Sequence, residues 1–271
     1  MRARKRFGQH FLTDQGVLQN IVRAAGVTGS DHLLEIGPGQ GALTELLADT
    51  PALYRAVEID RDLVPMLRAR FPNLDVIVDD ILRVDLHKVL DGDVPWRLLG
   101  NLPYNISSPL LASLTAFVAA RPGQVADMHF MLQREMAERL SALPGTKAWG
   151  RLSVMVQLRF DVEHMFDVRP DAFSPPPRVW SSIVRLMPTR AVAQDVDFKV
   201  LDQLLRLAFS GRRKRLSNSL KTLDLDWSAI DLDPGLRADN VSRDEYVMLA
   251  RQLASRAEDT TELCKQESNQ Q

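Results

Sequence analysis

The sequence is poor in cysteine and in long hydrophobic runs. Its one cysteine, Cys264, allows no intrachain disulfide and no cysteine-based metal cluster, which fits a reducing compartment. The longest apolar run, residues 110–120, includes Ser113 and Thr115 and is far shorter than the roughly 20 residues of a membrane span. The first residues, MRARKRF, lack the apolar segment of a secretory signal. We therefore expect a cytoplasmic protein that does not associate with membranes.

An excess of charge of one sign is also absent. The chain has 34 lysine and arginine residues against 35 aspartate and glutamate residues, so its overall charge gives no sign of nucleic-acid binding. Two segments, residues 1–13 and 205–221, nevertheless contain basic residues and no acid. Such a patch can bind phosphate groups on a neutral protein, or it can be a solvated surface. The basic residues of the two segments are Arg2, Arg4, Lys5, Arg6, Arg206, Arg212, Arg213, Lys214, Arg215 and Lys221.

Histidines are few, and none has the spacing of a pair of metal ligands. We therefore predict no metal site. The composition, with 45% hydrophobic and 25% charged residues, is that of an ordinary globular protein. A chain of 271 residues is long enough for one large domain and one small domain. The histidines are His10, His32, His87, His129 and His164.

Short apolar runs alternate with helical segments along the first part of the chain. This alternation is typical of a parallel, doubly wound sheet. The predicted fold class is therefore α/β, with a Rossmann-like sheet. The predicted strands are residues 32–36, 53–59, 74–78, 97–99 and 128–132, and the predicted helices are residues 42–48, 62–70, 109–119 and 134–143.

The pattern changes after Gly150. We expect a helix over residues 152–160 and then two strands, 162–168 and 179–186, which form an antiparallel hairpin at the end of the sheet. The stretch 187–196 has little periodicity and is the predicted domain boundary. The predicted organisation is a Rossmann-like domain with a basic N-terminal segment (1–188), a small all-helical domain (189–256) with helices over 198–209, 212–223 and 243–256, and a flexible polar tail (257–271).

A glycine-rich turn, EIGPGQG, begins at Glu35 at the end of the first of these strands. Glycines let a ligand approach the backbone, and the helix that follows offers free N–H groups. Glu58 follows Gly37 by 21 residues, at the end of the next strand, where a carboxylate can accept hydrogen bonds from both hydroxyls of a ribose. Nicotinamide enzymes and S-adenosylmethionine enzymes both use this arrangement. The G-x-G-x-G spacing disfavours a pyrophosphate site, and a tight turn without a ligand is the alternative.

Two acids, Asp79 and Asp80, follow the third strand. A carboxylate at this position can accept a hydrogen bond from the exocyclic amine of an adenine, with Ile59 and Ile81 covering the faces of the ring. We favour Asp80 for this contact. Taken alone, the pair is better explained as a solvated strand end.

The segment Asn101-Leu102-Pro103-Tyr104 follows the fourth strand. An aromatic exocyclic amine is a poor nucleophile because its lone pair is delocalised. Two acceptors aimed at its hydrogens, the Asn101 side-chain oxygen and the Leu102 carbonyl, would localise that pair and stabilise the positive charge that grows as a methyl group transfers. Pro103 would stiffen the turn, and Tyr104 would stack on the base. A simple turn that closes a strand is the alternative.

The segment FSPPPRV begins at Phe173. A base must leave its stack to be methylated, and aromatic side chains can hold the flipped base. Phe173 would then form the other side of a sandwich with Tyr104. A core position beside a proline-rich loop explains Phe173 equally well.

These segments together resemble one family, the bacterial small-subunit ribosomal RNA adenine dimethyltransferases. The likeness extends in order from Arg4 to Arg251 and rests on RKRFGQHFL, EIGPGQGALT, GNLPYNISSPLL, FSPPPRV with Ser181 and Ser182 following, and GRRKRLSNSL. It implies a Rossmann-like methyltransferase domain and a helical C-terminal domain that faces RNA. It also implies transfer of two methyl groups from S-adenosyl-L-methionine to each of two adjacent adenosines. These lie in a hairpin loop near the 3′ end of the small-subunit RNA, in the immature small ribosomal subunit.

The resemblance also implies site residues. The family commonly has asparagine where this chain has His10, and an imidazole can still donate one hydrogen bond there. The basic run at Arg212 to Arg215 would face RNA. The implied cofactor contacts are His10, Leu12, Gly37, Glu58, Asp80 and Asn101, and the implied catalytic residues are Asn101, Leu102, Tyr104 and Phe173.

Other classes share parts of this pattern. The large-subunit RNA methyltransferases of the macrolide-resistance type have the glycine turn and a similar asparagine motif, but NLPYNISSPL and GRRKRLSNSL favour the small-subunit enzymes. Amine methyltransferases of DNA and glutamine methyltransferases of proteins do not explain the N-terminal basic segment. A non-catalytic subunit-assembly factor is disfavoured by the intact Asn101 and Tyr104. We expect a monomeric enzyme.

Overall fold

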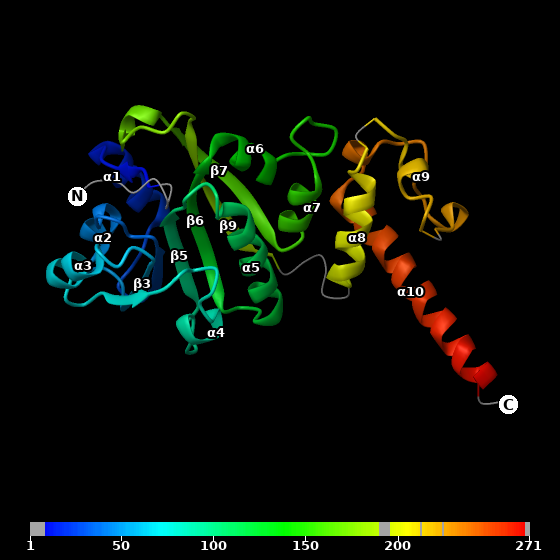
Figure 1. The fold of residues 1–271 in the computed structure, drawn as a ribbon, viewed down its shortest axis with the longest axis horizontal. Helices are drawn as coiled ribbons and strands as arrows, with labels where there is room; N and C mark the ends of the chain where they lie inside the picture. Colours follow the sequence, from blue (N-terminus) through cyan, green and yellow to red (C-terminus); the bar gives the residue numbers. More distant parts are fainter. Residues whose placement is uncertain (1–8, 190–195, 212, 224, 269–271) are drawn as a thin grey trace. The chain divides into compact units, whose positions relative to one another are not determined.

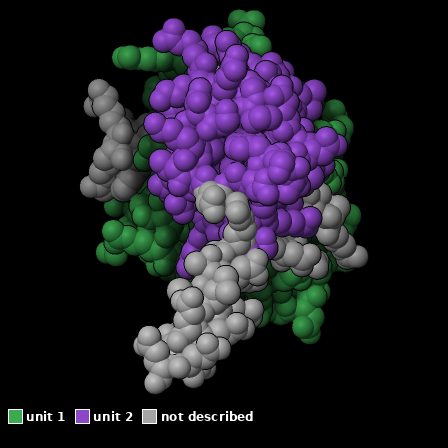
Figure 2. Space-filling model, turned by 90° about the vertical axis from the view of Figure 1, so that its right-hand side faces the viewer, with its two compact units in different colours: residues 1–138, 160–188 green, residues 139–159, 189–271 purple. Residues whose placement is uncertain are grey.

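The structure is a computed structural model that describes residues 9–189, 196–211, 213–223 and 225–268. The chain folds into two compact units, which Figure 2 distinguishes by colour. Unit 1 consists of residues 1–138 and 160–188, and unit 2 consists of residues 139–159 and 189–271. The basic residues Arg2 to Arg6 and Arg212 lie outside the described residues.

Unit 1 is built on a seven-stranded sheet (Figure 1). Five strands are parallel and most of their residues are buried, which agrees with their largely apolar sequences. The last two strands, β9 and β7, pair antiparallel at one end of the sheet, as predicted. In order across the sheet the strands are β4 (Asp75–Val78), β3 (Leu53–Glu58), β2 (His32–Ile36), β5 (Trp96–Asn101), β6 (Val125–Gln133), β9 (Ser181–Pro188) and β7 (Phe160–Val168).

Helices connect the parallel strands, so all of these strands end at the same edge of the sheet. This carboxyl edge is where open α/β sheets bind their ligands. A separate short ribbon, in which β1 pairs antiparallel with β8, joins the N-terminal segment to the loop before β9. The remaining elements of unit 1 are β1 (Phe11–Leu12), α1 (Gln15–Ala25), α2 (Ala42–Leu47), α3 (Val64–Arg70), α4 (Leu86–Val89), α5 (Ser107–Ala120), η2 (Pro170–Ala172) and β8 (Phe173–Ser174); α6 (Arg134–Leu140) crosses from unit 1 into unit 2.

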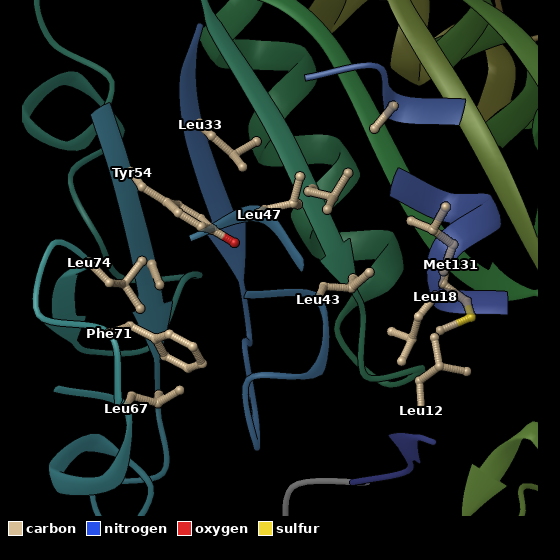
Figure 3. Close-up of a cluster of buried hydrophobic side chains, with 14 of the residues drawn as sticks. Leu12, Leu18, Leu33, Leu43, Leu47, Tyr54, Leu67, Phe71, Leu74 and Met131 are labelled. Atoms are coloured by element: carbon tan, nitrogen blue, oxygen red, sulfur yellow. The ribbon is translucent and has the colours of Figure 1, made fainter. Parts of the chain in front are cut away.

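A continuous apolar cluster holds the helices α1 to α3 against the sheet (Figure 3). Leu18 of α1, Leu47 of α2 and Leu67 of α3 are almost fully buried in it. Leu12 of β1 belongs to the same cluster, so the N-terminal segment is part of the core. The loops that follow β2, β3 and β4 therefore start from strands that are packed in this core.

Unit 2 has its own core. Trp149 and Tyr246 are buried there, and each satisfies its polar atom: the Trp149 Nε1 donates to the Val241 carbonyl at 3.0 Å, and the Tyr246 hydroxyl donates to the Ala238 carbonyl at 2.8 Å. The elements of this unit are α7 (Arg151–Gln157), α8 (Phe198–Ala208), α9 (Leu216–Ser219), η3 (Trp227–Ala229), η4 (Ala238–Asn240) and α10 (Arg243–Ser268).

Several boundaries differ from the predicted ones. Residues 139–159, which the sequence places with the first domain, pack in unit 2, because their apolar side chains join its core. The helix predicted over 152–160 ends at Gln157, and Phe160 instead pairs with Pro188 at the start of β7. The helix α10 continues to Ser268, beyond the predicted end at residue 256, and no glycine or proline interrupts that sequence.

The helix predicted over residues 212–223 is reduced to α9, which has four residues. The backbone N–H groups of Leu216 and Ser217 donate to the carbonyls of Leu236 and Pro234 rather than to the preceding turn. Tertiary hydrogen bonds therefore override the local helical pattern. Within the described part of the chain, no helix combines the length and apolar character that crossing a bilayer requires.

Candidate active site

A cavity of about 370 Å³ lies at the carboxyl ends of the parallel strands. Its volume is in the range of small-molecule and cofactor sites. It is lined by the loops after β2, β3, β4 and β5 and by the segment that contains β1. Eight of the predicted site residues line it, namely His10, Leu12, Gly37, Glu58, Asp80, Asn101, Leu102 and Tyr104.

The glycine turn lies between β2 and α2. Gly37 has a φ of +67°, a left-handed conformation that disfavours side chains, and its N–H donates to the Val57 carbonyl of the neighbouring strand at 2.9 Å. A Cβ on Gly37 would meet nothing within 4 Å, so the backbone at this residue borders open space. The turn therefore leaves room for a ligand to approach the main chain.

Glu58 ends β3 and is 3% exposed. One carboxylate oxygen accepts from the Gly39 N–H at 3.0 Å and the other from the Asp60 N–H at 2.8 Å. Burial raises the pKa of Glu58, and these backbone hydrogen bonds oppose that shift. Each oxygen keeps a further lone pair, which suits the carboxylate to accepting both hydroxyls of a ribose.

Asp79 and Asp80 both line the cavity after β4, together with Ile59 and Ile81. Asp79 is exposed, whereas Asp80 is half-buried and accepts from the Leu82 N–H at 3.0 Å. A carboxylate that shares a cavity with branched apolar side chains is suited to the amine edge of an adenine ring. The contact of Asp80 with the amine and the covering of the ring by Ile59 and Ile81 stay predictions.

Glu35 is a cavity-lining acid that the sequence analysis did not single out. It is buried at the end of β2, and its Oε2 accepts hydrogen bonds from the hydroxyls of Thr44 and Tyr54, both at 2.6 Å. Burial raises the pKa of Glu35, and the two hydroxyls counteract the shift. The sequence signal that could have identified Glu35 is its position as the acidic residue of the largely apolar strand HLLEI. Through these two hydrogen bonds Glu35 links β2 to Thr44 of α2 and to Tyr54 of β3, next to the glycine turn.

The N-terminal segment closes one side of the cavity. The Asn101 amide donates to the His10 carbonyl at 2.9 Å, and the His10 ring lies 2.7 Å from the Pro175 carbonyl. Gln9 donates to Asp60 at 3.1 Å, next to Glu58. The segment thus extends from Asp60 to Asn101 along the site. The cofactor contacts of His10 and Leu12 stay predictions.

Asn101 and Leu102 present two acceptors. Because the Asn101 Nδ2 donates to His10, the side-chain oxygen of Asn101 is left as the free end of the amide. Within the described residues, neither this oxygen nor the Leu102 carbonyl accepts a hydrogen bond. The Leu102 side chain is buried and its N–H donates to the Met131 carbonyl at 3.2 Å. The motif is therefore anchored while its acceptors stay available.

Gly100 explains why the motif can lie so close to β2. A Cβ at this position would be 2.7 Å from the Ile36 carbonyl oxygen, a distance that backbone atoms cannot accommodate without moving. A glycine lets β5 approach the end of β2, which brings Asn101 beside the glycine turn.

Tyr104 is held at two points. Its hydroxyl is 2.9 Å from the Ser181 Oγ, and its ring stacks on that of His10 with centroids 6.0 Å apart. Burial raises the pKa of Tyr104, so the phenol stays neutral at physiological pH. The contact with Ser181 was not predicted, because it joins residues 77 positions apart.

Phe173 does not line the cavity, in contrast to the predicted sandwich with Tyr104. It is 3% exposed and pairs with Leu12 across the ribbon of β1 and β8, inside the core of unit 1. The apolar ring is buried because it packs in the hydrophobic cluster that also contains Leu12 of β1. Its stacking role stays a prediction from the family resemblance, and in this structure it is a core residue.

No group of three or more histidine, cysteine, aspartate or glutamate side chains suited to a metal ion occurs among residues that the structure describes. The residues of the cavity instead fit S-adenosylmethionine: a glycine turn with an accessible backbone, a buried carboxylate for a ribose and a carboxylate for an adenine amine. When bound, this cofactor supplies an electrophilic methyl group. Fold and site together define a Rossmann-like methyltransferase whose target is an aromatic amine.

Comparison with known proteins identifies the family. Residues 1–255 match the family described as "Ribosomal RNA adenine dimethylase", and the chain belongs to this family. It is 47% identical over 260 residues to "Ribosomal RNA small subunit methyltransferase A" of Saccharophagus degradans, covering 93% of this chain and 95% of that protein. It is 46% identical over 259 residues to the protein of the same name from Pseudomonas aeruginosa, with 93% and 95% covered.

Solved structures show the same fold. A dimethyladenosine transferase from Plasmodium falciparum is 27% identical and has a TM-score of 0.73 over 89% of this chain and 96% of that chain. The 23S rRNA methyltransferase ErmE is 25% identical, with a TM-score of 0.68 over 90% and 99%. The predicted Rossmann-like fold, the S-adenosylmethionine cofactor and the enzyme class are confirmed: the protein is a ribosomal RNA adenine dimethyltransferase.

Proposed function

We propose that the enzyme transfers methyl groups to the exocyclic amines of two adjacent adenosines. These adenosines lie in a hairpin loop near the 3′ end of the small-subunit ribosomal RNA. The relatives named as small-subunit methyltransferases support this RNA over the large-subunit one. The enzyme acts as a monomer on the immature small subunit during late assembly, in the cytoplasm, where subunits are built. The observation that carries the proposal is the pair of free acceptors on Asn101 and Leu102 at the cavity.

The two acceptors activate the amine without a strong base. They accept hydrogen bonds from the two amine hydrogens, which turns the nitrogen towards tetrahedral geometry and localises its lone pair. The nitrogen would then attack the methyl carbon of bound S-adenosylmethionine, while the bond from that carbon to sulfur breaks and its electron pair stays on the sulfur of the departing S-adenosylhomocysteine. Positive charge appears on the amine as the new N–C bond forms, and the two oxygens stabilise it in place. The amine proton is acidic at this stage and passes to solvent.

A second methylation of the same nitrogen restricts how the acceptors can act. The monomethyl amine has one hydrogen, so one acceptor suffices for the second transfer, and the other must tolerate a methyl group. Asn101 is half-buried at the cavity, where a side-chain amide can shift more easily than the backbone carbonyl of Leu102. We therefore assign the permanent hydrogen bond to Leu102 and the adjustable one to Asn101.

Basic residues of unit 2 are the proposed contacts for RNA phosphates. Arg213, Lys214 and Arg215 are exposed in the loop before α9, and Lys221 is exposed after it. We expect replacement of Arg213, Lys214 and Arg215 by glutamine to weaken binding of small subunits. The slope of log K against log salt should become shallower by about one for each phosphate contact that is lost. Binding measured at several salt concentrations tests this expectation.

A matched variant removes the same charge elsewhere. Arg23, Lys88 and Arg121 are exposed on unit 1, and their replacement by glutamine should leave the slope nearly unchanged. Equal slopes for the two triple variants would show that the patch of unit 2 is only a solvated surface.

The reaction is tested by transfer of labelled methyl groups to unmethylated small subunits, with large subunits and duplex DNA in parallel, followed by nucleoside analysis. Dimethyladenosine confined to small-subunit RNA is the expected result. Label in large-subunit RNA would instead place the enzyme with the large-subunit RNA methyltransferases and nearer to its structural relative, the 23S rRNA methyltransferase ErmE. Bound cofactor without label in any substrate would point to an assembly factor that lacks activity.

A further inference from the structure

The carboxyl edge of the sheet carries an exposed indole one residue from the site. Trp180 is 42% exposed and immediately precedes β9, whose first residue, Ser181, contacts the Tyr104 hydroxyl at 2.9 Å. The Trp180 carbonyl accepts a hydrogen bond from the Arg134 N–H at 3.0 Å. The backbone of Trp180 is thus fixed close to the catalytic motif, while its side chain faces solvent.

An exposed tryptophan at this place needs an explanation. Among the described residues, Trp180 is the only aromatic residue in the group of large apolar side chains that are substantially exposed, and its neighbour Val179 is 43% exposed. A tryptophan left in water forgoes the free energy of burying a large apolar surface. Exposed aromatic side chains beside a nucleic-acid-modifying site are suited to stacking on bases.

The charges next to Trp180 suit a phosphate. The guanidinium carbon of Arg169 lies 5.9 Å from the centre of the indole ring, and Arg169 pairs at 3.3 Å with Asp171, where both side chains are about 70% exposed. Such an exposed pair is weak, so a phosphate can replace the carboxylate. Arg178 is exposed, and it has no acidic partner within the described part of the chain.

We propose that Trp180 stacks on a nucleotide that flanks the target adenosine, while Arg178 binds a phosphate of the same strand. The inference rests on the proposed function, because it takes the substrate to be a single-stranded RNA loop. Withdrawing one base from such a loop removes a stacking partner from its neighbour. The indole of Trp180 replaces that partner and holds the strand while the adenosine is in the site.

The test compares steady-state kinetics of Trp180 variants of the full chain on unmethylated small subunits. Trp180→Ala should raise KM about tenfold, which is within the range for loss of one base–aromatic stack, while kcat, cofactor affinity and melting temperature change little. Trp180→Phe should restore most of the KM, since it keeps an aromatic face. Trp180→Leu should leave the KM high, because leucine is apolar but has no aromatic face on which a base can stack. Arg178→Gln should also raise KM and lower the salt dependence of binding.

Two control variants lie at the opposite edge of the sheet. The first is Val94→Ala, at a residue that is 40% exposed before β5. The second is Arg121→Gln, at the C-cap of α5. A KM for Trp180→Ala equal to that for Val94→Ala would overturn the proposal. Equal rescue by leucine and phenylalanine would also overturn it, in favour of an apolar contact with a protein. A lower melting temperature in both the alanine and the phenylalanine variant would show a structural role instead.

The failure of this inference is distinct from failure of the proposed function. If the wild-type enzyme does not methylate small-subunit RNA, the proposed function falls. If the wild type is active and every Trp180 variant matches it, only the stacking surface falls.

Discussion

Replacement of Asn101 by alanine is expected to lower kcat for methyl transfer by about 10²- to 10³-fold, the usual cost of removing one preorganised group that stabilises a transition-state charge. The side-chain oxygen of Asn101 is free to accept from the target amine, and alanine has no acceptor to replace it. The affinity for S-adenosylmethionine should fall only a few-fold, through loss of the hydrogen bond to the His10 carbonyl at 2.9 Å. Single-turnover kinetics and calorimetric titration of the cofactor separate the two effects.

Asn73→Ala provides the control, since Asn73 is an exposed asparagine in the turn before β4. It should leave kcat and cofactor affinity unchanged. Unchanged turnover in Asn101→Ala would remove the role assigned to this amide, and an equal loss of turnover and cofactor affinity would make Asn101 a cofactor-binding residue only.

Replacement of Glu58 by glutamine is expected to weaken cofactor binding by about 10- to 100-fold, the range for hydrogen bonds to a charged acceptor. The carboxylate already accepts from the N–H groups of Gly39 and Asp60. An amide has only one oxygen, so it cannot satisfy both donors and still accept from a ribose. The dissociation constant of S-adenosylmethionine, measured by calorimetry, is the readout. Glu45→Gln on α2, where Glu45 is exposed and pairs with Arg70, should leave that constant unchanged.

The pH dependence of cofactor binding gives an independent check on Glu58. Burial raises the pKa of this carboxyl, so it takes up a proton at a higher pH than an exposed glutamate does. A protonated carboxyl is a poorer acceptor. The affinity of the wild type should therefore fall as the pH is lowered through the raised pKa, whereas the affinity of Glu58→Gln should vary little over that range. Parallel profiles for the two proteins would show that another group controls binding.

The N-terminal segment is a structural part of the site. His10 receives the Asn101 amide through its carbonyl and stacks its ring on Tyr104, and the next residues form β1 against β8. The backbone carbonyl of residue 10 makes the bond to Asn101, and any amino acid supplies a carbonyl. A histidine at this position, where the family resemblance implies asparagine, therefore leaves that bond intact.

Local sequence was sufficient for much of the fold and of the cofactor site. The parallel strands are largely apolar runs, and parallel strands joined by helices must end at one edge. Glu58 and Asn101 are the last residues of β3 and β5, and Asp80 lies two residues beyond the end of β4, so their meeting at one cavity was predictable from where the strands end. The antiparallel pair β7 and β9 was likewise indicated by the short connection between its strands.

Other features depend on distant partners and emerge only in the folded chain. The side chains at the strand ends could be located from the sequence, because periodicity is a local property. The sequence did not predict that Ser181 anchors Tyr104 or that Phe173 packs in the core with Leu12 of β1. It also did not determine that residues 139–159 pack with the helices of unit 2. These contacts join residues far apart in the chain, and their free energy comes from burial and hydrogen bonds that form only when the complete fold brings them together.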